Sequence, residues 1–170
     1  LAVVFTPDEH TSLDAYTWTR DRLILVTLAD VVSRVEVVTP GTWTREPVVG
    51  LPPNTSVSVV AADEYGDEVF YDSSGFDTPS RLLWGSAGGE LVEVKSAPAF
   101  FDASDVTVEQ YFATSDDGTR VPYFVVGHRD STGPGKTLLG GYGGFEVSQV
   151  PAYSGVVGKA WLERCGVYAL

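Results

Sequence analysis

The most informative shortages in this 170-residue sequence are those of cysteine, of basic residues and of long apolar runs. The single cysteine, Cys165, excludes a disulfide framework within the chain. Lysine and arginine number 11 against 23 aspartate and glutamate, and the resulting net charge of −12 disfavours nucleic acid and anionic membrane surfaces as partners. No apolar run reaches the ~18–20 residues that a membrane-spanning helix needs. We therefore expect no nucleic-acid and no membrane partner.

The negative charge is concentrated in the first part of the chain. Residues 1–105 hold 17 acidic and 6 basic residues, a net charge of −11, whereas residues 106–170 hold 6 and 5, a net charge of −1. Residues 98–107, with a proline and small polar side chains, fall at the same point and are typical of a linker. The two observations together predict two domains, residues 1–101 and 102–170.

Short β runs separated by turn residues every eight to twelve positions fill the sequence up to about residue 101. The expected strands are Ala2–Thr6, Leu13–Thr17, Arg22–Leu28, Arg34–Val38, Thr42–Arg45, Val57–Asp63, Glu68–Tyr71, Leu82–Gly85 and Leu91–Val94. This spacing indicates a sandwich, a barrel or propeller blades, and no repeat is sharp enough to choose among them. Trp18, Trp43 and Trp84 are expected to pack on strand faces.

A β hairpin opens the second part of the chain. It is expected to pair Val106–Thr114 with Arg120–Val126 across Asp117-Gly118, because glycine accepts the positive φ of a tight turn. Pro122 places its strand at a sheet edge or at the start of the hairpin, since proline cannot donate to a ladder.

A βαβ unit is expected after the hairpin. An apolar strand ends at Leu139, a glycine-rich loop follows, and apolar residues at helical spacing predict a helix over Val156–Arg164 that stops at Gly166. A strand over Val167–Leu170 completes the unit, which predicts a mixed, largely parallel sheet.

The glycine-rich loop is Gly140-Gly141-Tyr142-Gly143-Gly144-Phe145. Inside a strand each glycine would cost about 0.5–1 kcal/mol relative to alanine. Past the end of a strand the same residues let the backbone turn sharply or lie against a ligand. A loop that presents the phenol of Tyr142 and the apolar ring of Phe145 indicates part of a binding site. The alternative is a structural turn with two core aromatics.

Three motifs in a fixed order extend this interpretation: Ser115-Asp116-Asp117-Gly118-Thr119-Arg120-Val121-Pro122, the GYGGF motif at 141–145, and Pro151-Ala152-Tyr153-Ser154. Together they resemble the opening of the catalytic domain in the prolyl oligopeptidase family of serine peptidases. The resemblance covers roughly residues 105–170 by motif and the earlier part more loosely. It implies a mixed fold, with the last blades of a β-propeller over 1–101 and the first part of an α/β-hydrolase domain over 102–170.

The resemblance also implies a function and site residues. Family members are serine-type peptidases that cleave short proline-containing peptides on the carboxyl side of proline through an acyl-enzyme. By this resemblance the hydroxyl of Tyr142 donates a hydrogen bond to the oxyanion, and Phe145 lines the pocket for the proline ring. Gly143 and Gly144 keep the backbone clear of the substrate. The family has tyrosine or a similar residue where this chain has Gly140, which leaves a gap behind Tyr142.

The catalytic triad of such an enzyme is not in this sequence. A G-x-S-x-G turn is missing, and Ser154 precedes a helix without a strand before it. Neither His10 nor His128 suits the role of base, and His128 is expected to be exposed in a polar loop over 127–136. We expect an internal segment of a longer protein that is inactive without the rest of that protein. A cytoplasmic location is expected, with periplasm or secretion left open.

Other chemistries find little support. Residues 132–137 are similar to the end of the phosphate-binding motif G-x-x-x-x-G-K-[ST]. Asp130 stands where that motif needs its first glycine, and a strand follows where the motif needs a helix. Nucleotide binding is therefore rejected, and no cofactor is expected. His10 has no second ligand at suitable spacing, and the acidic turn over residues 63–68 does not match a calcium loop, so no metal site is expected. Two alternatives stay open: a related oligopeptidase that cleaves after basic residues, and a non-catalytic β-rich binding module.

Overall fold

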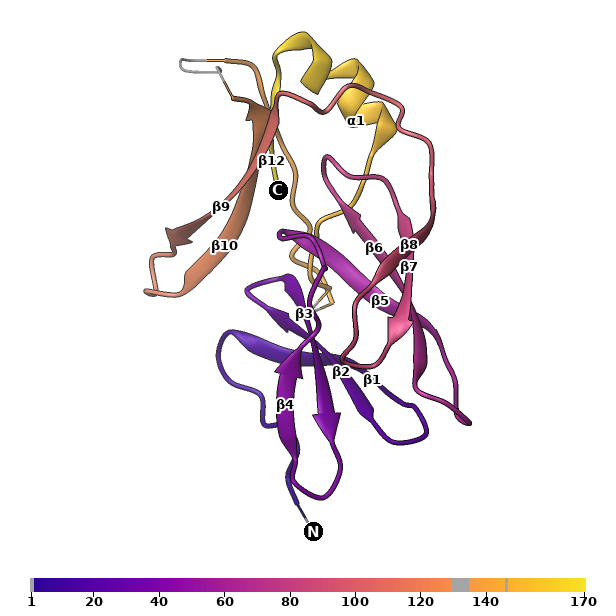
Figure 1. Cartoon of the computed structure of the whole chain (residues 1–170). Coiled ribbons are helices and arrows are strands. Elements are labelled where there is room, and N and C mark those ends of the chain that lie inside the picture. Colours follow the sequence, from indigo (N-terminus) through magenta and orange to yellow (C-terminus); the bar gives the residue numbers. More distant parts are fainter. Residues whose placement is uncertain (1, 130–134, 146) are drawn as a thin grey trace.

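The computed structural model describes residues 2–129, 135–145 and 147–170, which form three four-stranded sheets (Figure 1). The first sheet contains β1 (Thr11–Trp18), β2 (Leu23–Ala29), β3 (Val32–Thr39) and β4 (Thr44–Pro47). The second contains β5 (Thr55–Ala62), β6 (Glu68–Gly75), β7 (Arg81–Ser86) and β8 (Val92–Ser96). Both are antiparallel meanders with neighbours in chain order. Such a meander is the unit from which propellers are built.

The third sheet has the order β11-β12-β10-β9 and mixes strand directions. Its strands are β9 (Val106–Thr114), β10 (Arg120–His128), β11 (Thr137–Leu139) and β12 (Val167–Ala169). β11 and β12 are parallel, and the crossover between them contains helix α1 (Gly155–Ala160) and the 3₁₀ turn η1 (Leu162–Arg164). The predicted βαβ unit is confirmed, although the other two pairings of the sheet are antiparallel.

The first hydrophobic core lies between the first two sheets. Its buried members are Ile24, Val26, Val35, Val37, Val57, Val69, Tyr71 and Leu83. Most are β-branched, as suits strands. Those of β3 and β5 alternate with polar residues, whereas β2 is buried on both faces. The core is therefore built from strand residues alone, and the two meanders stabilise each other through it.

The second core is assembled from segments far apart in the chain. Its buried members are Phe76, Phe101, Val106, Phe124, Val126 and Leu162. The rings of Phe76 and Phe124 lie 5.2 Å apart, so a residue just after β6 packs directly against the third sheet. A Cβ added at Gly158 of α1 would overlap the ring of Phe101, which explains the absence of a side chain there.

The predicted elements agree with the structure except at a few places. Eight of the nine strands expected before residue 101 overlap β1 to β8, but Ala2–Thr6 forms no strand. The hairpin of β9 and β10 has the predicted turn, with Gly118 at φ +87°. Pro122 pairs with β9 in the part of β10 that β12 does not reach.

Two tryptophans and the helix end differ from expectation. Trp18 ends β1 but is 47% exposed, so it packs only in part, and Trp43 lies in a turn with φ +59° and not on a strand face as predicted. The helix ends earlier than predicted, at Ala160, and the left-handed residue that follows η1 is Cys165 rather than Gly166. Within the described ranges no helix is long and apolar enough to cross a membrane.

Candidate functional site

The glycine-rich loop begins where β11 ends. The amide of Gly140 donates to the carbonyl of Ala169 on β12 at 2.8 Å, which continues the parallel pairing by one residue. The chain then turns away from the sheet, with Gly143 at φ +74° and Phe145 at φ +55°. The loop therefore lies at the carboxyl end of a parallel strand, where open α/β sheets bind ligands.

The two aromatic side chains of the loop point into solvent. Phe145 is 93% exposed and Tyr142 is 58% exposed, so neither is a core residue in the described part of the chain. A bulky residue in the left-handed region is strained, and an exposed ring gains no burial to offset that strain. Neither ring is packed in a core of the described residues, and the choice between a binding loop and a structural turn stays a prediction.

Gly143 and Gly144 suit the loop for separate reasons. A left-handed φ at Gly143 suits a residue without a Cβ. A Cβ at Gly144 would lie 3.3 Å from Cε1 and Cζ of the Tyr142 ring, which is closer than ordinary contact. The glycine lets the phenol lie close against its own backbone. Whether both also leave room for a substrate stays a prediction.

The space behind Gly140 is occupied. A Cβ there would lie 3.1 Å from Cδ1 of Leu170 and 3.2 Å from the hydroxyl of Tyr168. The expected gap is therefore wrong, because two residues from the β12 end of the chain fill the place where the family has a larger residue. Burial raises the pKa of the Tyr168 hydroxyl, which favours its neutral form.

The segment after the loop is anchored on both sides. The Tyr153 hydroxyl accepts a hydrogen bond from the amide of Phe100 at 2.7 Å, and its ring stacks on Phe101 with centroids 5.2 Å apart. The Tyr153 amide donates to Oγ of Ser74 on β6 at 3.4 Å. The hydroxyl of Ser154 accepts from the amide of Val157 and caps α1. Ser154 therefore has a structural role.

His128 is not exposed as predicted. It ends β10 and its Nε2 lies 2.9 Å from the carbonyl oxygen of Leu162, so it is partly buried against η1. Of the polar loop predicted over 127–136, residues 130–134 lie outside the described part of the chain. His10 lies elsewhere, with Nδ1 3.2 Å from Oδ1 of Asp30. No group of three metal-binding side chains occurs among the described residues.

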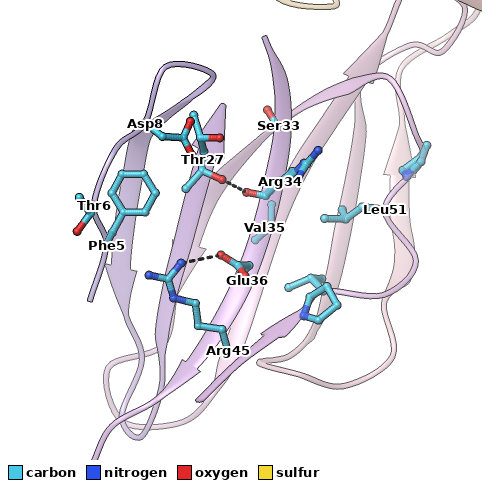
Figure 2. Close-up of a pocket in the computed structure, with 14 residues that line it drawn as sticks. Phe5, Thr6, Asp8, Thr27, Ser33, Arg34, Val35, Glu36, Arg45 and Leu51 are labelled. Carbon is cyan, nitrogen blue, oxygen red and sulfur yellow. Dashed lines mark hydrogen bonds and ion pairs between the residues drawn. The ribbon is translucent and has the colours of Figure 1, made fainter. Parts of the chain in front are cut away.

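A separate cleft of about 560 Å³ lies on the first sheet (Figure 2). Arg45 pairs with Glu36 at 3.3 Å across it, and the guanidinium carbon of Arg45 lies 5.9 Å from the centre of the Phe5 ring. The residues that line the cleft include no histidine and none from the glycine-rich loop. Its Arg45–Glu36 ion pair is already formed, and nothing in the cleft connects it with the glycine-rich loop.

The acidic turn between β5 and β6 serves as a structural contact. Oδ1 of Asp67 accepts from the hydroxyl of Thr19 at 2.7 Å and from the amide of Asp21 at 3.0 Å. These hydrogen bonds, led by that of Thr19, hold the pKa of Asp67 below its ordinary value of 3.8. The contact joins a turn of the first sheet to a turn of the second.

Comparisons with known proteins extend along the whole chain. An uncharacterised peptidase of Sinorhizobium fredii, y4nA, is 41% identical over 173 residues, covering 99% of this chain and 24% of its own length. A prolyl endopeptidase of Elizabethkingia miricola is 31% identical over 125 residues, covering 72% of this chain and 18% of its own. No family model matches the chain.

The fold is matched as well. The structure of a post-proline cleaving enzyme from Rickettsia typhi superposes with a TM-score of 0.79 at 30% identity, over 98% of this chain and 25% of that enzyme. The chain spans about a quarter of the length of these relatives. Sequence relatives and structural neighbours agree, and the chain therefore belongs to the prolyl oligopeptidase family.

Proposed function

We propose that this chain is part of a serine-type peptidase that cleaves short peptides on the carboxyl side of proline. The first two sheets are the last blades of a propeller, and residues 102–170 begin an α/β-hydrolase domain whose triad lies in the rest of the protein. The observation that carries the proposal is the exposed pair Tyr142 and Phe145 on a glycine frame at the carboxyl end of β11.

Tyr142 supplies the oxyanion donor in this proposal. When a serine hydroxyl from elsewhere in the protein attacks the peptide carbonyl, negative charge develops on the carbonyl oxygen. A positioned phenol O–H donates to that oxygen and stabilises the tetrahedral intermediate more than the substrate. The absence of a side chain at Gly144 leaves the space beside the Tyr142 ring open, since a Cβ there would lie 3.3 Å from that ring. Acyl-enzyme formation then releases the amine product, and water completes hydrolysis.

Phe145 supplies the specificity contact. A pyrrolidine ring offers only apolar surface, and a flat aromatic side chain covers such a surface without leaving a polar group unpaired. The 93% exposure of Phe145 leaves its ring free to contact a ligand or a later part of the protein. The relative from Elizabethkingia miricola, a prolyl endopeptidase, supports proline as the preferred residue.

Tyr142→Phe in the full-length protein tests the oxyanion role. We expect kcat for a proline-containing peptide to fall by about 10²–10³-fold with little change in KM, because the hydroxyl acts when charge develops. Tyr65→Phe removes the same atom from an exposed tyrosine in the turn between β5 and β6 and is the matched control. Full activity in Tyr142→Phe would refute the role.

Phe145→Ala tests the specificity role. We expect it to reduce the preference for proline over alanine at the cleaved position by about 1–3 kcal/mol, the range of an apolar pocket contact. Leu139→Ala, which truncates another exposed apolar side chain of the same segment, is the control. Unchanged proline preference would assign Phe145 to contacts with the rest of the protein, and cleavage after arginine or lysine would favour the alternative peptidase.

A further inference from the structure

Tyr168 of β12 lies against the residue at which the glycine-rich loop leaves the sheet. It pairs with Leu138 of β11 in the parallel ladder, and Gly140 follows Leu138 by two residues, on the same face of the sheet. A Cβ at Gly140 would lie 3.2 Å from the hydroxyl oxygen of Tyr168 and 3.4 Å from Cε2 of its ring. The Tyr168 side chain therefore extends along β11 to the backbone of Gly140.

Space, and not backbone conformation, excludes a side chain at residue 140. Gly140 does not have the left-handed φ that Gly143 adopts, so its backbone would accept other residues. An added Cβ would also lie 3.1 Å from Cδ1 of Leu170. Tyr168 and Leu170 thus cover a bare stretch of backbone, as aromatic side chains on a neighbouring strand do for glycines in sheets.

The Tyr168 ring is held in place by the second core. The ring of Phe76 meets it nearly edge to face, with centroids 6.1 Å apart and an angle of 74° between the planes. This is one of the favoured arrangements of aromatic pairs. Phe76 is itself buried and lies 5.2 Å from the ring of Phe124. Packed core residues therefore fix the position of the ring that covers Gly140.

Beyond Gly140 the loop has little to hold it to the sheet. The Gly140 amide donates to the carbonyl of Ala169 at 2.8 Å, whereas no amide of residues 141–145 donates to the sheet in the described part of the chain. A Cβ at Gly141 would have no heavy atom within 4 Å. The direction in which the loop starts is therefore set at Gly140, two residues before Tyr142.

We propose that Tyr168 is a positioning residue for Tyr142. Its ring covers the Gly140 backbone and keeps water from the hydrogen bond between Gly140 and Ala169, and a hydrogen bond in less polar surroundings is stronger. The start of the loop is thereby fixed, and with it the place of the Tyr142 hydroxyl. The step that concerns Tyr142 rests on the proposed function, whereas the cover over Gly140 does not.

Kinetics of the full-length protein with a proline-containing peptide test this role. We expect Tyr168→Ala to lower kcat about ten- to a hundredfold with little change in KM, because a misplacement of about 1 Å can cost about 10²-fold. Tyr168→Phe keeps the ring and should keep nearly the kcat of the parent protein. Tyr123→Ala is the control, since it removes a ring of β10 that stacks on Tyr111, and should leave kcat unchanged.

Combining Tyr168→Ala with Tyr142→Phe separates positioning from general damage. If Tyr168 acts through the Tyr142 hydroxyl, its truncation should change kcat by less than about twofold once that hydroxyl is gone, because residues that act as a unit are not additive. Effects of the two changes that multiply would show that Tyr168→Ala harms the protein as a whole, and would overturn the role. An equal loss of kcat in Tyr168→Phe would overturn it too, because the ring is still present there.

Exchange of the Gly140 amide with deuterium gives a second readout that does not depend on activity. Tyr168→Ala should speed this exchange about two- to tenfold relative to Tyr168→Phe, through weakening of one hydrogen bond. Unchanged exchange would overturn the proposal. If Tyr168→Ala fails to fold, Tyr168→Leu takes its place in every measurement, since leucine keeps apolar volume without the reach of the ring. Full activity of Tyr142→Phe would refute the proposed function, and exchange at Gly140 would then decide whether Tyr168 fixes the loop.

Discussion

The two hydrophobic cores differ in where their side chains come from. The first draws on neighbouring strands of two meanders, each buried residue belonging to β2, β3, β5, β6 or β7. The second draws on a loop after β6, the linker, the β9–β10 hairpin and η1, with Phe76 and Leu162 at its extremes in sequence. The first core can form from local pairings, whereas the second depends on several distant segments arriving together.

Exposed apolar residues occur in both regions but on different kinds of element. In the first two sheets they lie on strands, as Tyr16 on β1, Val60 on β5 and Val92 on β8 do. In the third-sheet region the most exposed, Phe145, lies in the glycine-rich loop. The candidate site therefore differs from the rest of the exposed apolar surface by its place in a loop.

Phe124→Ala should give the largest difference in stability between the two cores. Loss of a fully buried ring is expected to cost about 3–5 kcal/mol and to leave a cavity in the second core. Exchange of the β9 and β10 amides should rise far more than that of β2 and β3. Ile24→Ala, a truncation in the first core, should give the reverse pattern. Equal loosening of both regions by both variants would show that the cores unfold as one unit.

Gly158→Ala should produce a smaller effect of the same kind. The added methyl overlaps the Phe101 ring, and such overpacking typically costs about 1–3 kcal/mol. Urea denaturation of the full-length protein measures the change. Gly141→Ala adds the same methyl where no heavy atom lies within 4 Å and should have little effect. Equal stability of the two variants would show that α1 moves to accept the methyl.

The smallest expected effect concerns Asp67, which links the first two sheets. Its pKa is lowered in the folded chain, so its charged form stabilises folding above the ordinary value of 3.8, and this contribution disappears as pH falls through the lower folded pKa. Asp67→Asn should remove that part of the acid dependence of stability. Thr19→Val, which removes the leading hydrogen bond, should reduce it. The measurement is the free energy of unfolding of the parent protein and both variants between pH 2 and pH 7, a range that spans ordinary carboxyl pKa values of about 4. The same pH dependence in all three proteins would show that the contact does not contribute.

The sequence predicted local features well. The Val35-Glu36-Val37 alternation of β3 and the Asp117-Gly118 turn depend on neighbouring residues, so their signals are visible in a single sequence. The glycine loop was placed correctly after β11, and its exposed aromatics were singled out by their chemistry. The roles assigned to Tyr142 and Phe145, and the domain boundary at 101/102, stay predictions.

The misses share a physical cause, which is dependence on distant partners. Ala2–Thr6 has the composition of a strand but pairs with no strand among the described residues, and backbone pairing decides a strand. His128 is partly buried against η1, through a hydrogen bond to Leu162, 34 residues later in the chain.

Trp161 supplies residues 102–170 of this chain with a fluorescent side chain. It is the only tryptophan after residue 101, and its Nε1 donates to the carbonyl of Val167 at 2.8 Å, next to the strand that supports the glycine-rich loop. The chain's one thiol, Cys165, is exposed four residues later. A small contact quencher attached there would dim Trp161, so opening of the η1–β12 corner could be followed as a rise in its emission without adding a residue to the chain.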